Sequence, residues 1–134
     1  MSSLKRETSG PVLFHRLSRD ELTLDPTLLK DHGRTARTLV KEGALRITLM
    51  GLSQGGVLPE HSGAGPMSIH MLRGDVIFTA LGIEHPLSAG DVLVFAGGVS
   101  HAARSQSGCV FLLTVAHVPA MDGEPGKSAA RSES

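Results

Sequence analysis

From residue 35 to residue 118, the chain is divided into short apolar runs by turn-forming segments. The runs are rich in Val, Ile, Leu, Phe and Thr, and the segments between them read KEG, SQGG, SGAGP, LGIEHP, SAG, AGGVS and SQSG. Short strands punctuated at this spacing are typical of β-sandwiches and barrels, and they leave no room for the crossover helices of a parallel sheet. We therefore predict an all-β fold of two packed antiparallel sheets over about Thr35 to Val118.

Apolar and polar residues alternate in two of these runs. In ALRITLMG the odd-numbered residues from Leu45 to Leu49 are apolar, and in DVIFTALG the even-numbered residues from Val76 to Ala80 are apolar. Each such strand therefore has a buried and an exposed face. The runs MLRGDVIF and CVFLLTVA carry bulky residues on both faces, so we expect their second face to be covered by another sheet or another subunit. A homodimer is the expected assembly.

The ends of the chain differ from this middle part. The segment PTLLKDHG predicts one short helix, with Asp25 as its cap, Pro26 in its first turn and Gly33 just after its end. Residues 1–10 and 119–134 are small and polar, and they have too little apolar area to offset the entropy of ordering them. We expect one domain over residues 11–118, with disordered segments on both sides.

Composition excludes several classes of protein. The 134 residues suit a single domain, and Lys plus Arg equals Asp plus Glu at 13 each, so no charge excess favours nucleic acid or an anionic membrane. Cys109 is the single cysteine and is expected to be an inert buried thiol. The sequence has no apolar stretch of membrane-spanning length and no signal-peptide pattern, which predicts a cytoplasmic protein.

Two spaced motifs lie between residues 55 and 105. In the first, Gly55, the five residues GVLPE, His61 and Gly74 follow the spacing of the first motif of the cupin family, which this chain resembles. Gly63 stands where that motif has its second histidine, and Met67 stands where it has a glutamate. The spacing of the motif is kept, but two of its ligand positions are not.

The second motif is GDVLVFAGGVSHAARS. Gly90, Gly98 and His101 match the second cupin motif in register, while Ala96 replaces its proline and Ser105 replaces its asparagine. The resemblance covers residues 34 to 118. It implies a double-stranded β-helix, the cupin jelly-roll barrel, here with a short N-terminal helical segment. Independently of the family, the glycines between strand-like runs are expected to serve tight bends.

The resemblance implies that His61 and His101 point into the barrel, as the remaining ligands of a site that in intact members has three histidines and a glutamate. Two neutral imidazoles can hold one divalent transition metal (Zn, Fe, Mn, Ni or Cu) when water or a third side chain completes the shell. Without a metal, the same pair can hydrogen-bond a ligand or act as a general base. Both alternatives stay open at this point.

His70 and Met67 are weaker candidates for a third ligand. The strand parity that turns Met67 inward turns His70 outward, unless a bulge near Pro66 reverses the register. The Met67 thioether beside two imidazoles would suit Cu(I), but it can equally be an apolar side chain that fills a reduced metal site.

Parity also predicts an apolar pocket around the two histidines. Its expected lining is Ile47, Leu49, Met67, Ile69, Met71 and Phe78. Such a pocket suits a small organic ligand, and the absence of Trp and Tyr removes aromatic platforms for carbohydrates or bases. We expect a small, bacterial-type cupin that binds a small molecule, with or without a metal. The alternatives are a metal-dependent dioxygenase, cyclase or isomerase, and a metal or metabolite sensor without turnover.

Overall fold

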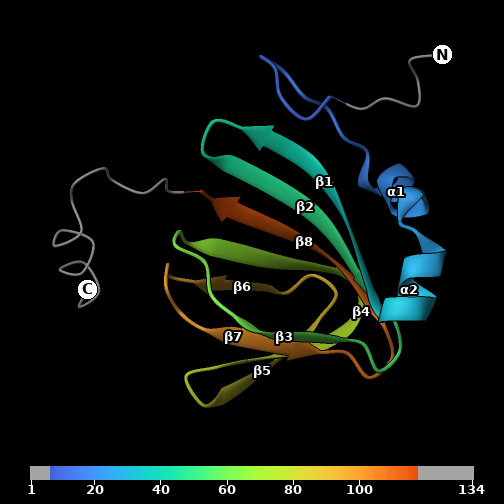
Figure 1. Ribbon diagram of the computed structural model, residues 1–134, viewed down its shortest axis with the longest axis vertical. Helices are drawn as coiled ribbons and strands as arrows, with labels where there is room; N and C mark the ends of the chain where they lie inside the picture. The colour runs from blue at the N-terminus through green and yellow to red at the C-terminus, as the bar shows by residue number, and fades with distance from the viewer. Residues whose placement is uncertain (1–6, 118–134) are drawn as a thin grey trace, which may run out of the picture.

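The computed structural model describes residues 7–117 of the chain. It is a curled antiparallel sheet whose two halves face each other, with short helices beside one half (Figure 1). The strands are β1 (Arg34–Glu42), β2 (Leu45–Leu52), β3 (Val57–His61), β4 (Met67–Ala80), β5 (Ile83–Ser88), β6 (Val92–Phe95), β7 (His101–Arg104) and β8 (Cys109–Ala116). The predicted all-β jelly roll is confirmed.

The long strand β4 belongs to both halves of the barrel. Its first part pairs with β8 and β6, and its second part pairs with β7 and β5. The register shifts between Met71 and Arg73, just before the motif residue Gly74. Gly74 has a φ of 79°, and a Cβ there would lie 2.1 Å from the carbonyl oxygen of Gly108, so only glycine fits. This motif glycine is structural, as expected.

The inner faces of the two halves form the main core. Its buried members are Leu52, Leu58, Met67, Ile69, Met71, Val76, Phe78, Ala80, Leu87, Phe95, Ala103, Cys109 and Phe111. Burial raises the pKa of the Cys109 thiol, which keeps it protonated and agrees with the inert role expected for it.

A second core lies on the outer face of β1, β2 and β8. Leu24, Leu39, Val40 and Leu49 are buried there, and Leu13 and Leu17 from the N-terminal segment pack against them. The expectation that another sheet or subunit covers this face is corrected: the chain covers it with its own N-terminal segment (Figure 1). The bulky residues on both faces of β8 are explained in this way, because Val110 and Leu112 contact this second core.

The N-terminal segment contains α1 (Leu17–Asp20), a 3-10 turn (Glu21–Thr23) and α2 (Pro26–His32). The prediction for α2 is confirmed: the Asp25 carboxylate accepts from the amides of Thr27 and Leu28, and Gly33 ends the helix at a φ of 78°. The sequence did not predict α1, which is only one turn long.

His15 anchors this segment to the sheet. Its Nε2 donates to the Leu39 carbonyl oxygen at 2.9 Å, and its Nδ1 lies 3.3 Å from Oδ2 of the buried Asp20. The Thr8 carbonyl oxygen accepts from the Lys41 amide, so the chain already lies against β1 within the stretch expected to be disordered. The expected disorder of residues 119–134 lies outside the described residues.

Some apolar side chains remain exposed. Val92 and Val94 on the edge strand β6 are 60% and 64% exposed. Homodimerisation stays a prediction. Val92 and Val94 support it, because exposed apolar side chains on an edge strand can pair with a second copy of the chain. In residues 7–117, no helix has the length and apolar character needed to cross a membrane.

Candidate binding site at a histidine pair

His61 and His101 are cross-strand neighbours on β3 and β7. Their ring centroids lie 4.4 Å apart in an edge-to-face arrangement. The register of β3 shifts between Leu58 and His61, so two residues intervene between side chains that both face the barrel interior. This bulge, which includes Pro59, brings His61 onto the same face as His101.

The backbone fixes the tautomer of both imidazoles. Nδ1 of His61 donates to the Pro59 carbonyl oxygen at 2.8 Å, and Nδ1 of His101 donates to the Val99 carbonyl oxygen at 3.0 Å. A carbonyl oxygen only accepts, so each Nδ1 carries the proton. Each neutral ring therefore has its lone pair on Nε2, the arrangement that backbone partners impose on metal-binding histidines.

His101 is held in an apolar environment. Its ring stacks on Phe95 with centroids 4.6 Å apart and an interplanar angle of 9°, and only 3% of the residue is exposed. Burial lowers the pKa of His101, the nearby His61 lowers it further, and the hydrogen bond to Val99 opposes them. His101 is therefore neutral at pH 7, while His61 is exposed at the open side of the barrel.

A cavity of about 70 Å³ adjoins the two rings. It is lined by Met50, Leu58, His61, Met67, Ile69, Phe78, His101, Phe111 and Leu113. Met67, Ile69 and Phe78 were expected in this lining, and Met71 is buried in the same core without lining the cavity.

Ile47 and Leu49 do not line the cavity, and this expectation is corrected. Leu49 is buried in the outer core and Ile47 packs against it. Met50 on the same strand lines the cavity, so the even-numbered residues of β2 face inward. Alternation identified two faces of β2 correctly but assigned them the wrong way round, because the face covered by the N-terminal segment is the more apolar one.

Several residues of the site were consequently not predicted from the sequence. Met50, Leu58, Phe111 and Leu113 complete the cavity wall, and Phe95 holds His101. The apolar Met50 and Leu52, which follow the alternating run ALRITL on the opposite parity, are the signal that could have revealed the second buried face.

The two weaker candidates for a third metal ligand lie on opposite faces of β4. His70 is exposed and lies on the outer face of β4, because the register shift of that strand occurs after Met71 and not near Pro66. Met67 is 8% exposed and lines the cavity. A Cβ at Gly63 would lie 3.7 Å from Cε of Met67, so the two positions at which cupins have further ligands adjoin each other here.

The chain's own donors do not form a complete metal shell. In the described part of the chain, no group of three or more His, Cys, Asp or Glu side chains could hold a metal ion. The nearby carboxylate of Glu60 accepts from the Ser100 hydroxyl at 2.6 Å, in an exposed position. A metal held by the two histidines would therefore need water or an organic molecule to complete its shell.

A larger hollow lies beside α2. It has a volume of about 670 Å³ and shares Met50 and Leu58 with the lining of the histidine cavity. Its other lining residues are Leu28, His32, Arg34, Thr35 and Ala36. The two spaces are therefore neighbours that border the same two side chains.

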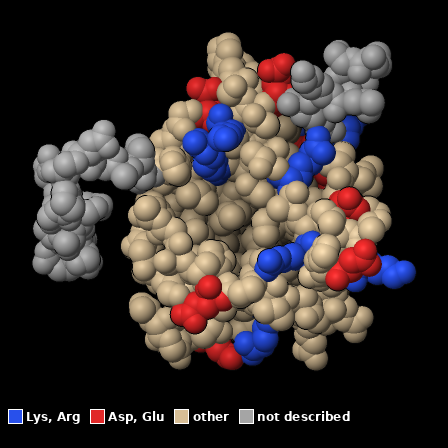
Figure 2. All heavy atoms as spheres, in the orientation of Figure 1, with Lys and Arg blue, Asp and Glu red and all other residues tan. Residues whose placement is uncertain are grey.

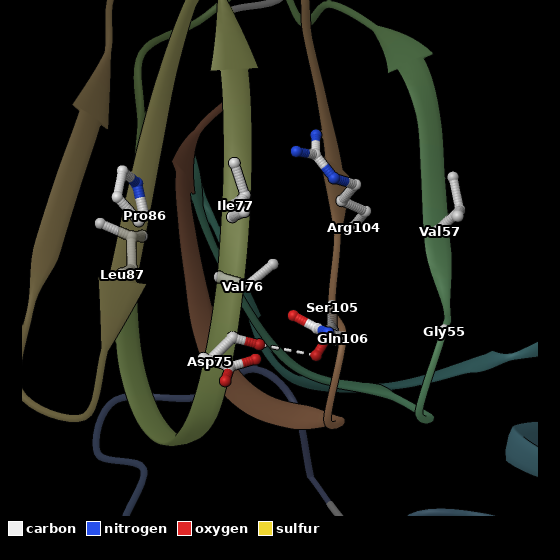
Figure 3. A pocket seen from close by; sticks show the side chains of 10 residues that line it. All are labelled: Gly55, Val57, Asp75, Val76, Ile77, Pro86, Leu87, Arg104, Ser105 and Gln106. Carbon is white, nitrogen blue, oxygen red and sulfur yellow. Dashed lines mark hydrogen bonds between the residues drawn. The ribbon is translucent and has the colours of Figure 1, made fainter.

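Another hollow, of about 480 Å³, lies away from the histidines and is shown in Figure 3. Val57, Ile77 and Arg104 line it from three neighbouring strands. Two of its polar side chains have structural partners: Nη2 of Arg104 pairs with Glu84, and the Ser105 hydroxyl donates to the Asp75 carbonyl oxygen. The smaller histidine cavity is the candidate site because two neighbouring imidazoles line it with oriented Nε2 atoms.

Comparison with solved structures shows the fold. An RmlC-like cupin from Desulfovibrio desulfuricans is 26% identical, with a TM-score of 0.60 over 64% of this chain and 84% of that one. KdgF from Halomonas is 17% identical, with a TM-score of 0.63 over 81% and 96%. Salicylate 1,2-dioxygenase from Pseudoaminobacter salicylatoxidans is 17% identical, with a TM-score of 0.72 over 87% of this chain and 36% of that one. No protein-family model matches the sequence, and no curated protein matches it significantly.

Proposed function

We propose that this chain, which has the cupin fold, binds a small organic molecule beside His61 and His101, and that the Nε2 atoms of the two histidines hold a divalent transition metal there. The organic molecule and water would complete the metal shell. The metal would act as a Lewis acid on a coordinated oxygen of the ligand.

The orientation of the two imidazoles carries this proposal. Both Nδ1 protons are donated to backbone carbonyls, and within residues 7–117 neither Nε2 atom has a hydrogen-bond partner. An isolated pair of surface histidines has no reason to be fixed in this way on adjacent strands. Backbone partners that orient ligating histidines are a regular feature of metal sites.

The surroundings favour a partly apolar ligand. The cavity wall is apolar apart from the two histidines, and two of its residues, Met50 and Leu58, also line the larger hollow beside α2. One structural neighbour is a dioxygenase whose structure contains adducts with gentisate, a small aromatic acid, which supports a ligand of comparable size in a barrel of this fold.

The proposal is tested by titrating Co²⁺ and Zn²⁺ into the wild type and into His61→Ala, His101→Ala and His70→Ala. We expect each of the first two substitutions to weaken metal binding at least about tenfold, because each removes one of two protein ligands. His70→Ala is the matched control, since His70 is exposed on the outer face of the barrel. Equal metal affinity in the wild type, His61→Ala and His101→Ala would refute a metal at this pair.

A further inference from the structure

We propose that Lys41 and Arg46 form an anion-binding rim inside the barrel that selects a ligand carrying a carboxylate. This inference rests on the proposed function, because it names the chemical class of the organic molecule that would reach the histidine pair. Neither residue was a candidate from the sequence.

The strand register places both side chains on the inner face. Lys41 is the cross-strand partner of Arg46, and partners in an antiparallel pair share a face. Their neighbours Val40 and Ile47, also partners, belong to the outer core. Because side chains alternate along a strand, Lys41 and Arg46 face the opposite way, into the hollow.

One row of cross-strand neighbours joins this rim to the histidine site. Arg46 pairs with Val115, Val115 pairs with Met67, and Met67 pairs with Phe95. Met67 lines the histidine cavity and Phe95 stacks on His101. Adjacent strands are about 4.8 Å apart, so the backbone at Arg46 is about 10 Å from that at Met67.

The charge on this face has no protein counterpart. Two like charges lie directly opposite each other, which is unfavourable. In residues 7–117, neither Lys41 nor Arg46 forms an ion pair; Nη1 of Arg46 instead donates to the carbonyl oxygens of Gly43, at 2.6 Å, and Leu45. These bonds hold the guanidinium at the hairpin while its other donors stay available.

The rest of this inner face also carries positive charge. By register it also carries Arg34, and none of the inward-facing positions of β1, β2 and β8 is an Asp or Glu, although the whole chain has 13 basic and 13 acidic residues. Figure 2 shows the hollow with basic side chains near its border, one group of them over the hairpin end of β1 and β2, and with a group of acidic side chains below it. A cleft lined by one sign of charge attracts ligands of the opposite sign.

These observations favour a small organic acid with an apolar body. Its carboxylate would bind between the Lys41 ammonium and the Arg46 guanidinium, and its apolar part would extend over Met67 toward the histidine pair. A guanidinium and a carboxylate form strong charge-assisted hydrogen bonds, which a neutral ligand of the same shape cannot replace.

The test uses benzoate and its uncharged isostere benzamide, titrated by NMR and by calorimetry into wild type, into Lys41→Gln/Arg46→Gln and into Arg37→Gln. Arg37 lies on β1 opposite Leu49 and therefore on the outer face, so Arg37→Gln is a control for loss of a positive charge on the same strand. We expect benzoate to bind wild type at millimolar concentration or below and benzamide to bind more weakly. The double variant should lose about tenfold to a hundredfold in benzoate affinity, and Arg37→Gln should lose little.

Three outcomes would overturn the inference: no benzoate binding at millimolar concentration, equal binding of benzoate and benzamide, or an unchanged benzoate affinity in the double variant. Co²⁺ titration of the double variant separates the two proposals, because the metal should still bind His61 and His101 when the rim is removed. Both proposals are supported if the double variant no longer prefers benzoate to benzamide but still binds Co²⁺. Only the rim is supported if the wild type prefers benzoate to benzamide but binds no metal at the histidines.

Discussion

The two faces of the β1–β2 hairpin differ sharply, although alternate residues of the same stretch of chain form them. On the outer face, Leu49 is fully buried beneath the N-terminal segment, within a core of Leu24, Leu39 and Val40. On the inner face, Arg46 and Met50 remain partly accessible, and Met50 lines the histidine cavity. The outer face of the hairpin is a closed apolar core, whereas its inner face is only partly buried and carries basic residues.

This difference shows that the more apolar face of a strand is not necessarily the face of the binding site. Burial against the N-terminal segment requires a continuous apolar surface, whereas a ligand cavity needs polar groups at selected positions. If this is correct, substitutions on the outer face should change stability most, and substitutions on the inner face should change binding most.

The largest expected effect is a change in the free energy of unfolding when neighbouring residues on opposite faces of β2 are substituted. Leu49→Ala should lower the free energy of unfolding by about 2–5 kcal/mol, because it leaves a cavity in a closed core. Met50→Ala should cost less, because its side chain borders an existing cavity, but it should alter ligand binding. Urea denaturation of both variants measures this, and a larger loss from Met50→Ala than from Leu49→Ala would contradict the assignment of faces.

A second prediction concerns the reduced metal site of the inner face. Gly63→His/Met67→Glu should create a site with more protein ligands, because these positions adjoin each other beside the histidine pair. Metal at a hundred times its Kd should then stabilise the double variant by about 2.7 kcal/mol. Without metal, the variant should be less stable than wild type, since the new carboxylate replaces a buried thioether.

Thermal melts with and without Zn²⁺ measure this effect, and Met67→Glu alone is the control for burying the carboxylate. A double variant that Zn²⁺ stabilises no more than it stabilises the wild type would show that the barrel geometry does not suit a four-ligand site.

The smallest expected effect is a pH dependence that arises at His101. Its pKa in the folded protein is lowered from the ordinary value of 6.5, mainly by burial, so below pH 6.5 the unfolded chain takes up a proton before the folded one does. Stability should therefore fall as the pH decreases from 6.5 toward the folded-state pKa, and this group should contribute no change above that range.

Urea denaturation at a series of pH values on both sides of 6.5 measures this dependence. His101→Gln should show a weaker decline than wild type on the acidic side, because the other titrating groups are common to both proteins. Identical pH profiles for the two proteins would mean that His101 is not the source.

The glycine-punctuated runs and the two motifs were sufficient to predict the barrel, and Asp25, Pro26 and Gly33 were sufficient to predict α2. These features are local: a capping side chain or a glycine turn acts within a few residues of itself. The spacing of His61 and His101 also identified the pair that the structure brings together, although the sequence could not show that Pro59 and Val99 carbonyls fix their tautomers.

The tertiary structure alone decided which face of each strand is inside. Alternation along β2 defines two faces, but it carries no information on which one meets the barrel and which one meets the N-terminal segment, because both are buried against partners distant in sequence. That choice moved Ile47 and Leu49 into the outer core, brought Met50 to the cavity and placed Arg46 on the inner face. The sequence determined the strands, the turns and the histidine pair, and long-range packing determined what surrounds them.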